Sequence, residues 1–324
     1  MNWEGRKVII TGGAGFIGSH LAKELLSRGA SVTVFDNLST GRLGNLSDSI
    51  DRLEVIRAST LEPLRLSRAM QGADTVFHLA AVLGVKRTWE EPIRVILENV
   101  QGTHNVLHAA SDVGARKVVL ASSSEVYGDG APPYVETEGA APRTGYAAAK
   151  LLEEKLAEAF TRETGLSTTS LRYFNVYGPG QECSAYGFVT AIFCDRVLQG
   201  LPPIVFGDGE QTRDFTFVQD TVRGTILAAE REANEHEVYN LGTGVETSIV
   251  RLARVVLSAA GRTDIAPVHV DSRADEVRRR VADARAAKSR LGWAPRVQLQ
   301  QGLAHTLGTP IAGIPQARSE ATPS

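Results

Sequence analysis

Short apolar runs alternate with longer amphipathic stretches along the first half of the chain. Six runs rich in β-branched and aromatic residues are typical of strands, at 8–10, 31–35, 53–56, 75–79, 117–122 and 167–171. The stretches between them place apolar residues at helical spacing, most clearly over 19–28 and 146–164. Strands that alternate with helices build a parallel sheet covered on both faces. The pattern therefore predicts an α/β fold with a doubly wound parallel sheet over residues 1–172.

Beyond Arg172 the pattern changes, because Gly and Pro clusters at 178–180, 200–203 and 207–209 divide the chain into shorter pieces. We expect a smaller α/β lobe over 173–307, with helices at 248–260 and 299–307. Some segments, such as 238–241, are expected to return to the main sheet. Residues 308–324 are rich in Pro, Ala, Ser and Gly, which predicts a flexible tail.

Charge and composition narrow the classes of partner. The 324 residues carry 35 Lys and Arg against 37 Asp and Glu, a net charge of -2, which gives no electrostatic reason to bind nucleic acid or an anionic membrane. The start leaves no room for a signal peptide, and no apolar run approaches the roughly 20 residues of a membrane helix. We expect a cytoplasmic protein. Only Cys183 and Cys194 occur, too few for a disulfide framework or a typical zinc cluster, so no metal is expected.

A glycine-rich turn joins the first strand to the first helix. Gly12, Gly15 and Gly18 stand where the lack of a Cβ lets the backbone approach a pyrophosphate, and the helix N-terminus then supplies donors to the phosphates. Asp36 ends the second strand, where a carboxylate accepts hydrogen bonds from an adenosine ribose and repels a 2′-phosphate. The Rossmann-like pattern thus predicts NAD rather than NADP. A purely structural turn and a solvated strand-end Asp are the alternatives.

A phenol and an ammonium lie one helical turn apart at Tyr146 and Lys150. Lowering a tyrosine pKa from about 10 to about 7 takes roughly 4 kcal/mol, and a nearby ammonium and an oxidised nicotinamide could supply it. Tyr146 would then act as general base toward a hydroxyl whose carbon gives up a hydride. The alternative is a surface pair without chemistry.

The ordered motifs resemble those of the extended short-chain dehydrogenases/reductases, in the NAD-dependent nucleotide-sugar epimerase/dehydratase family. The resemblance covers nearly everything from Lys7 to Gly302. Its motifs are the turn at 11–18, Asp36-Asn37, and the segments 78–81, 99–103, 122–128, 146–150, 172–179 and 207–215.

The resemblance implies roles for individual residues. Ser123 would share the proton relay with Tyr146, Lys150 would hold the nicotinamide ribose, and Glu125 would be a further catalytic group. The implied NAD site comprises Gly12, Gly15, Phe16, Ile17, Gly18, Asp36, Asn37, Leu79, Ala80, Ala81, Asn99, Ser122, Tyr146 and Lys150. At 58–60 the chain has Ala-Ser-Thr where relatives usually carry an Asp that touches the adenine, which puts that contact in doubt.

Three reactions of this family begin with oxidation at C4. Dehydration is disfavoured because Ser124 replaces the expected acid, although Glu125 keeps it open. A UDP-glucuronate decarboxylase shares Ser-Glu-Val-Tyr-Gly at 124–128 but usually differs at 80–82 and 213–215. The best fit is therefore NAD-dependent 4-epimerisation of UDP-glucuronate or UDP-glucose/galactose. A non-catalytic NAD-binding sensor is the alternative outside enzymes.

For the UDP-sugar, the resemblance selects Arg213 and Arg273 on the diphosphate and Asn175 beside the phosphates or sugar, together with Ser123, Ser124 and Tyr146. Arg280 falls where hexose epimerases carry the Tyr or Cys that lines the sugar pocket. A long cation there would crowd an N-acetyl group and could pair with a C6 carboxylate, which favours UDP-glucuronate. Lys86 and Arg87 are weaker candidates for that role.

Several features also have structural explanations. Residues 278–280 could form a solvated basic face, Arg213 and Arg273 could lie on solvated loops, and Asn175 could simply form a turn. Apolar stripes after Asn99 and Tyr146 permit the homodimer common in this family, but they could equally be core.

Overall fold

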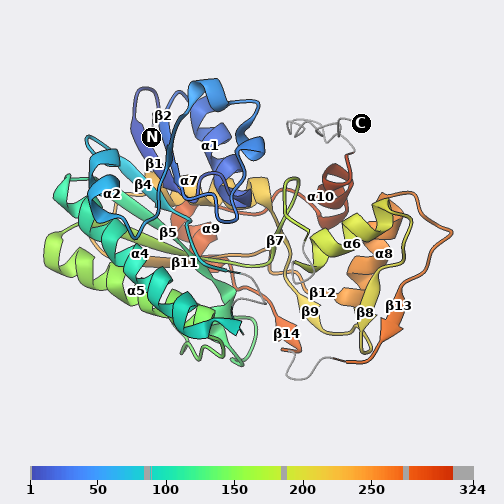
Figure 1. Ribbon diagram of the computed structural model, residues 1–324. Coiled ribbons are helices and arrows are strands. Elements are labelled where there is room, and N and C mark those ends of the chain that lie inside the picture. Colours follow the sequence, from blue (N-terminus) through green and yellow to red (C-terminus); the bar gives the residue numbers. More distant parts are fainter. Residues whose placement is uncertain (1, 84–87, 89, 184–187, 273–276, 309–324) are drawn as a thin grey trace.

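The computed structural model describes residues 2–83, 88, 90–183, 188–272 and 277–308. Its centre is a sheet of seven parallel strands in the order β11-β6-β5-β4-β1-β2-β3 (Figure 1). The strands are β1 Lys7–Thr11, β2 Ser31–Asp36, β3 Glu54–Arg57, β4 Thr75–His78, β5 Lys117–Ser123, β6 Ser167–Tyr173 and β11 Glu237–Leu241. The predicted doubly wound α/β fold is confirmed.

Strand order reverses between β1 and β4, and this decides where a ligand can bind. The chain first adds β2 and β3 on one side of β1, then returns to place β4 on the other side. At such a switch point the loops leave in opposite directions and open a crevice at the carboxyl ends of the strands. The predicted glycine turn follows β1 at this point.

Helices cover both faces of the sheet (Figure 1). One layer contains α1 Phe16–Ser27, α7 Val218–Glu230 and α9 Arg285–Leu291, and the other contains α2 Pro63–Ala69, α4 Pro92–Asp112 and α5 Gly145–Thr164. Alternate strand residues face alternate layers, so Val8 and Ile10 pack toward α1 while Ile9 packs toward α2 and α4. Burial on both faces explains why these strands are continuous apolar runs.

Helix α5 is fixed at both ends, and it carries the predicted catalytic pair. The Thr144 side chain accepts a hydrogen bond from the backbone N–H of Ala147, an N-cap directly before Tyr146. Gly165 ends the helix in the left-handed conformation, at φ 76°. Both ends agree with the helix expected at 146–164.

The remainder of the chain forms a smaller lobe, on the right in Figure 1. Its helices are α6 Val189–Leu198, α8 Ile249–Ala259 and α10 Leu299–Thr306. Short strands pair as β7 Val176–Tyr177 with β10 Thr216–Phe217, as β8 Ile204–Phe206 with β13 Val268–Val270, and as β9 Thr212–Arg213 between β12 Thr247–Ser248 and β14 Arg279–Arg280. Three 3-10 turns, η1 Leu43–Leu46, η2 Ile50–Arg52 and η3 Ser124–Tyr127, complete the described structure.

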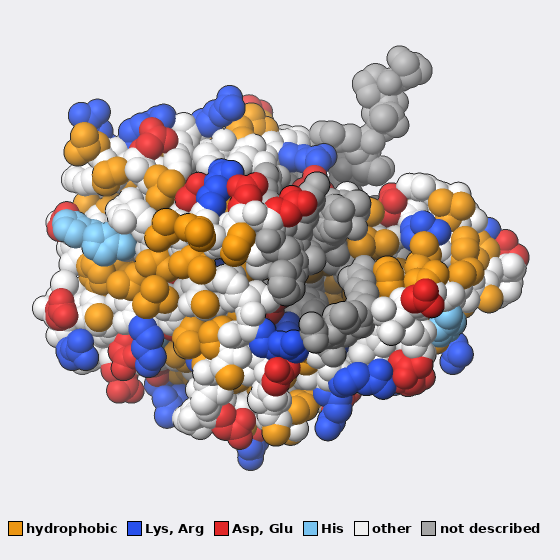
Figure 2. Space-filling view, turned by 60° about the horizontal axis from the view of Figure 1, so that its bottom comes forward, with side chains coloured by type: hydrophobic (Ala, Val, Ile, Leu, Met, Phe, Trp, Pro, Cys, Tyr) orange, Lys and Arg blue, Asp and Glu red, His pale blue; other side chains and the backbone are white. Residues whose placement is uncertain are grey.

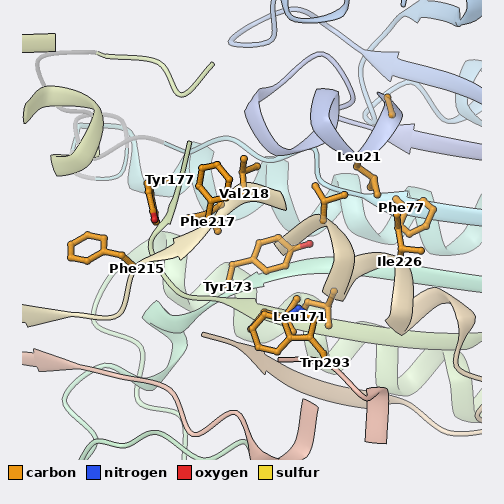
Figure 3. Close-up of a cluster of buried hydrophobic side chains, with 14 of the residues drawn as sticks. Leu21, Phe77, Leu171, Tyr173, Tyr177, Phe215, Phe217, Val218, Ile226 and Trp293 are labelled. Atoms are coloured by element: carbon orange, nitrogen blue, oxygen red, sulfur yellow. The ribbon is translucent and has the colours of Figure 1, made fainter. Parts of the chain in front are cut away.

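One continuous apolar core joins the two parts. Leu21, Phe77 and Ile226 fill the layer between the sheet, α1 and α7, and Tyr177 and Phe217 extend this cluster into the smaller lobe (Figure 3). β11, from the second half of the chain, pairs with β6 and closes the sheet. The lobes are therefore connected by packing as well as by the chain. The expected tail falls almost entirely in 309–324, outside the described residues.

Candidate active site

The glycine turn after β1 has no room for side chains. A Cβ on Gly12, where φ is 72°, would lie 2.6 Å from the backbone nitrogen of Ala80. A Cβ on Gly18 would overlap the carbonyl oxygen of Gly12. Gly15 caps the N-terminus of α1, and a Cβ there would meet the Gly12 oxygen at 3.2 Å. The turn thus packs α1 closely on the sheet and brings the N-terminus of this helix to the crevice.

A pocket opens beside this turn at the carboxyl ends of β1, β2 and β4. Among the predicted cofactor residues, those that line it are Gly12, Gly15, Asp36, Asn37, Leu79, Ala80, Ala81 and Asn99. The described lining does not include Phe16, Ile17 or Gly18, which lie in the first turn of α1. It does not include Ser122, Tyr146 or Lys150 either. The sequence analysis did not anticipate Ser39, Thr40 and Gly41, which also line the pocket. Their position directly after the Asp36-Asn37 motif could have predicted that they line the pocket.

Asp36 organises the adenosine side of the pocket. Its carboxylate accepts hydrogen bonds from the backbone N–H groups of Ala14, at 3.0 Å, and Leu38, at 2.8 Å. A Cβ on Gly41 would come within 2.8 Å of the same carboxylate. A carboxylate has about four lone-pair sites, so Asp36 keeps acceptor capacity for a ribose hydroxyl while it shapes the loop.

Asn99 and Ser122 have defined structural partners. The Asn99 amide bonds both backbone groups of Val82, at 2.6 and 2.9 Å, and so holds the loop after β4 against α4. The Ser122 hydroxyl donates to Glu154 at 2.5 Å, and Arg172 pairs with the same buried carboxylate at 2.7 Å. Ser122 therefore anchors β5 to α5 in this structure, a role the sequence analysis did not foresee.

The predicted catalytic residues meet at the end of β5. The Ser123 side chain lies close enough to the Tyr146 phenol to act on its pKa, and the Lys150 Nζ lies 5.8 Å from the centre of the Tyr146 ring. Ser123 also accepts a hydrogen bond from the backbone N–H of Glu125, at 3.2 Å. The fold thus assembles hydroxyl, phenol and ammonium from β5 and α5. β5 pairs with β4, and the residues that follow β4, Leu79 to Ala81, line the nucleotide pocket.

Tyr146 differs electrostatically from the expectation. Burial raises the pKa of its phenol, and the negative charges of Glu125 and Glu153 raise it further, while the Ser123 side chain opposes the shift. The sequence analysis expected the Lys150 ammonium to lower this pKa, but its Nζ donates to Glu153 at 3.0 Å in a fully buried ion pair. The described residues thus favour the neutral phenol, and an added positive charge, such as that of oxidised nicotinamide, would favour the phenolate.

Two arginines lie side by side on neighbouring strands of the smaller lobe. Arg213 on β9 is the register partner of Arg280 on β14. The Arg213 guanidinium donates to the carbonyl oxygens of Thr212 and Val277, both at 2.8 Å, which fixes its direction. Arg273, which was predicted to bind the diphosphate together with Arg213, lies outside the described residues, as do Lys86 and Arg87.

Arg280 differs from its neighbours in burial. Arg278 and Arg279 are exposed and pair with Asp208 and Glu246, as a solvated basic face would. The Arg280 side chain is only 14% exposed, and one of its terminal nitrogens lies 3.9 Å from a Glu125 oxygen. Its Nε is buried without a hydrogen-bond partner in the described part of the chain. Arg280 thus points inward, toward the catalytic group, and the basic-face interpretation is wrong for this residue.

Asn175 and Ser124 have their own structural constraints. Asn175 adopts φ 31°, and its side-chain amide donates to the carbonyl of Asp214 at 3.0 Å, so it stabilises a turn. Ser124 is buried at the start of η3.

Comparison with known proteins identifies the family. A family model described as the NAD dependent epimerase/dehydratase family matches residues 8–242. The chain belongs to this family. It is 39% identical over 314 residues to UDP-N-acetyl-alpha-D-glucosaminuronate decarboxylase of Bacillus cytotoxicus, covering 93% of this chain and 97% of that protein.

Solved structures agree with this assignment. The UDP-glucose 4-epimerase of Thermotoga maritima with UDP-glucose superimposes with a TM-score of 0.88 at 38% identity, over 93% of this chain and 97% of that one. The UDP-glucuronic acid 4-epimerase of Bacillus cereus, in complex with UDP-glucuronic acid and NAD, gives 0.84 at 32% identity, over 92% and 96%. The predicted family and the NAD cofactor are confirmed.

The residues that line the pocket of this epimerase/dehydratase family member match the groups of NAD. The close-packed turn presents backbone N–H groups for a pyrophosphate, and Asp36 stands where a ribose would reach it. Lys150 commits one of its three donors to Glu153, which leaves donors for the nicotinamide ribose. At 58–60, the pocket is lined by Ala58, Ser59 and Thr60, so a small polar surface faces the adenine side. No cluster of metal-binding side chains occurs among the described residues.

Proposed function

We propose that this enzyme catalyses the NAD-dependent 4-epimerisation of a UDP-hexose, with UDP-glucuronate favoured over UDP-glucose. The observation that carries the proposal is the assembly of Ser123, Tyr146 and Lys150 where β5 ends, on the strand that pairs with β4 of the nucleotide pocket. In this proposal residues 1–172 bind NAD, and residues 173–307 bind the UDP-sugar.

The proposed chemistry begins with the hydroxyl at C4. Tyr146, as phenolate, accepts the hydroxyl proton, and Ser123 holds the oxygen through its own hydroxyl. Bound NAD supplies the hydride acceptor and later the hydride donor. Tyr146 then returns the proton to the oxygen of the rotated 4-keto sugar. Since the same group removes and restores the proton, the reaction needs no further acid.

The preference for a uronate rests on Arg280. A buried guanidinium with one unpartnered donor needs an anion, and Glu125 meets it only at 3.9 Å. A C6 carboxylate could accept from Arg280 in a charge-assisted hydrogen bond. The long side chain also reduces the space for an N-acetyl group. Arg213, and Arg273 outside the described residues, would hold the diphosphate, with Asn175 and Ser124 beside the phosphates or sugar.

Decarboxylation of a UDP-uronate is the second candidate. Oxidation at C4 places a ketone β to the C6 carboxylate, and such acids lose carbon dioxide readily. The Glu125–Arg280 contact would offer a carboxylate and a cation to that group, and the similarity to UDP-N-acetyl-alpha-D-glucosaminuronate decarboxylase supports the same outcome. An epimerase must instead hold the substrate carboxylate firmly, which a hydrogen bond from Arg280 would do.

One incubation distinguishes the two reactions. The purified enzyme is supplied with NAD and UDP-glucuronate, and the products are identified by mass spectrometry and proton NMR. Epimerisation predicts UDP-galacturonate of unchanged mass, whereas decarboxylation predicts a UDP-pentose and free carbon dioxide. Parallel incubations with UDP-glucose and UDP-N-acetylglucosamine test selectivity. Fastest turnover of the N-acetyl sugar would contradict the role proposed for Arg280.

We also propose a homodimer formed through α4 and α5. Ile93 and Leu97 on α4 are 73% and 62% exposed, and Leu152 on α5 is 46% exposed. Figure 2 shows hydrophobic side chains gathered on this side of the larger part of the molecule. A second copy of the same two helices would cover such a patch.

A further inference from the structure

Glu153 is a buried carboxylate next to the proposed catalytic pair that the reaction described above does not use. It follows Lys150 by three residues on α5, and its side chain is 3% exposed. Its Oε2 accepts from the Lys150 ammonium at 3.0 Å. Its Oε1 is buried without a well-formed hydrogen bond in the described part of the chain, and the nearby Thr103 side chain acts on the carboxyl by lowering its pKa. A half-satisfied buried carboxylate is costly to the fold, so its place at this ammonium calls for a functional explanation.

The surroundings make Glu153 the main counter-charge of Lys150. Within the described residues, Lys150 forms its ion pair with Glu153 alone. His78 on β4 also faces this region, between the hydroxyls of Thr11 at 2.7 Å and Thr103 at 2.9 Å. Burial, and then Lys150, lower the pKa of His78 to about 3, so this imidazole is neutral at physiological pH.

The other nearby carboxylates either pair with another residue or raise the pKa of Tyr146, as Glu153 does. Glu154 is engaged by Arg172 and Ser122. The negative charge of Glu125 on η3 also raises the pKa of the Tyr146 phenol, and Arg280 of β14 lies near this carboxylate. Burial raises the pKa of Glu153, and Lys150 opposes that shift. Tyr146 is thus flanked by two carboxylates, of which Glu153 also controls the position of the ammonium.

We propose that Glu153 is a positioning residue: its carboxylate fixes the Lys150 ammonium under the Tyr146 ring, and its charge keeps the phenol protonated until a positive nicotinamide is bound. This proposal for Glu153 rests on the proposed function only because it takes Tyr146 as the catalytic base. Ionisation of the base then depends on the oxidised cofactor. Once the nicotinamide has accepted the hydride it is no longer positive, and the charge of Glu153 would then keep the proton on Tyr146.

Spectroscopic titration of Tyr146 tests this without any substrate. The phenolate absorbance of the NAD-loaded protein is followed against pH, and the spectrum of a matching Tyr146→Phe protein is subtracted to isolate one tyrosine. A nearby negative charge favours the protonated phenol, so its removal lowers the midpoint. We expect Glu153→Gln and Glu153→Met to shift the midpoint down by about one pH unit. Glu153→Asp, which keeps the charge, should stay near the wild-type value.

Glu154→Gln is the matched control, because it neutralises the adjacent buried carboxylate, which pairs with Arg172 instead. An unchanged midpoint in both neutral variants at 153, or an equal shift in Glu154→Gln, would overturn the proposal. Should the neutral variants not fold, Glu153→Asp decides: its shorter side chain displaces Lys150, so kcat should fall several-fold with an unchanged melting temperature. Wild-type kcat in Glu153→Asp would contradict the positioning role. Failure of the wild type to turn over any UDP-sugar would contradict the proposed function, not the titration.

Discussion

At the residue scale, the proposed catalytic chemistry depends on three side chains of α5, which are Tyr146, Lys150 and Glu153. Tyr146 and Lys150 are separated by one helical turn, so any helix over 146–164 brings them to one face. Glu153 lies on the same helix, yet a glutamate at that spacing usually faces solvent. Its burial depends on how α5 packs against α4 and β5, which no local pattern reports.

Arg280 carries the substrate prediction at this scale. Replacing it by Met removes the guanidinium while keeping most of the apolar stem. A lost hydrogen bond to a charged group costs about 1.5–3 kcal/mol, so kcat/KM for UDP-glucuronate should fall about tenfold to a hundredfold. The value for UDP-glucose, which has no C6 carboxylate, should change much less.

The neighbouring arginine offers a control for that measurement. Arg279→Met removes an exposed cation of the same strand that pairs with Glu246. It should leave the ratio of the two kcat/KM values unchanged. Equal losses for both sugars in Arg280→Met would show that Arg280 does not contact the carboxylate.

At the element scale, the regular strands and helices follow from the sequence because burial on both sheet faces gives continuous apolar runs. The two-residue strands of the smaller lobe do not. β14 consists of Arg279 and Arg280 and pairs with β9 over two residues, so no periodicity could have revealed it. Because the sequence does not reveal that pairing, it could not predict that Arg280 is buried while Arg278 and Arg279 are exposed.

The N-cap of α5 is the element on which the site depends most directly. Thr144→Ala removes the acceptor for the Ala147 N–H, and we expect a loss of about 1 kcal/mol in the free energy of unfolding. Because Tyr146 lies in the first turn, which loses its cap in this variant, kcat should fall as well. Urea denaturation and steady-state assays measure the two effects.

A second capped helix separates stability from position. Ser248 caps α8 in the same manner, accepting from the Arg251 N–H. Ser248→Ala should lower stability by a similar amount without the loss in kcat. A parallel loss of kcat in both variants would mean that the effect follows global stability rather than the placement of Tyr146.

At the scale of the whole molecule, strand order places the site. The reversal at β1 and β4 opens the nucleotide pocket, and the return of β11 to the sheet ties the smaller lobe to it. The sequence predicts the sheet and its glycine turn, but the relation between β5, α5 and β14 arises only from tertiary packing. The structure describes no helix that is long and apolar enough to cross a membrane.

The proposed dimer is a prediction at this scale. Leu97→Glu puts a charge into the exposed apolar patch on α4, and we expect dissociation to a monomer at micromolar concentration. Analytical ultracentrifugation measures the change. Leu64→Glu, at a 76% exposed position on α2, should leave the assembly intact. A wild-type protein that sediments as a monomer would contradict the dimer.

We propose Tyr146 as the base for an NAD-dependent oxidation of a UDP-sugar, and its removal tests this role most directly. Tyr146→Phe removes the phenol oxygen and keeps the ring, so NAD should still bind with unchanged affinity. General base catalysis contributes typically 10²- to 10⁴-fold, and we expect turnover of UDP-glucuronate or UDP-glucose to fall by about 10³-fold. Turnover within a few-fold of the wild type, with NAD bound, would contradict the account.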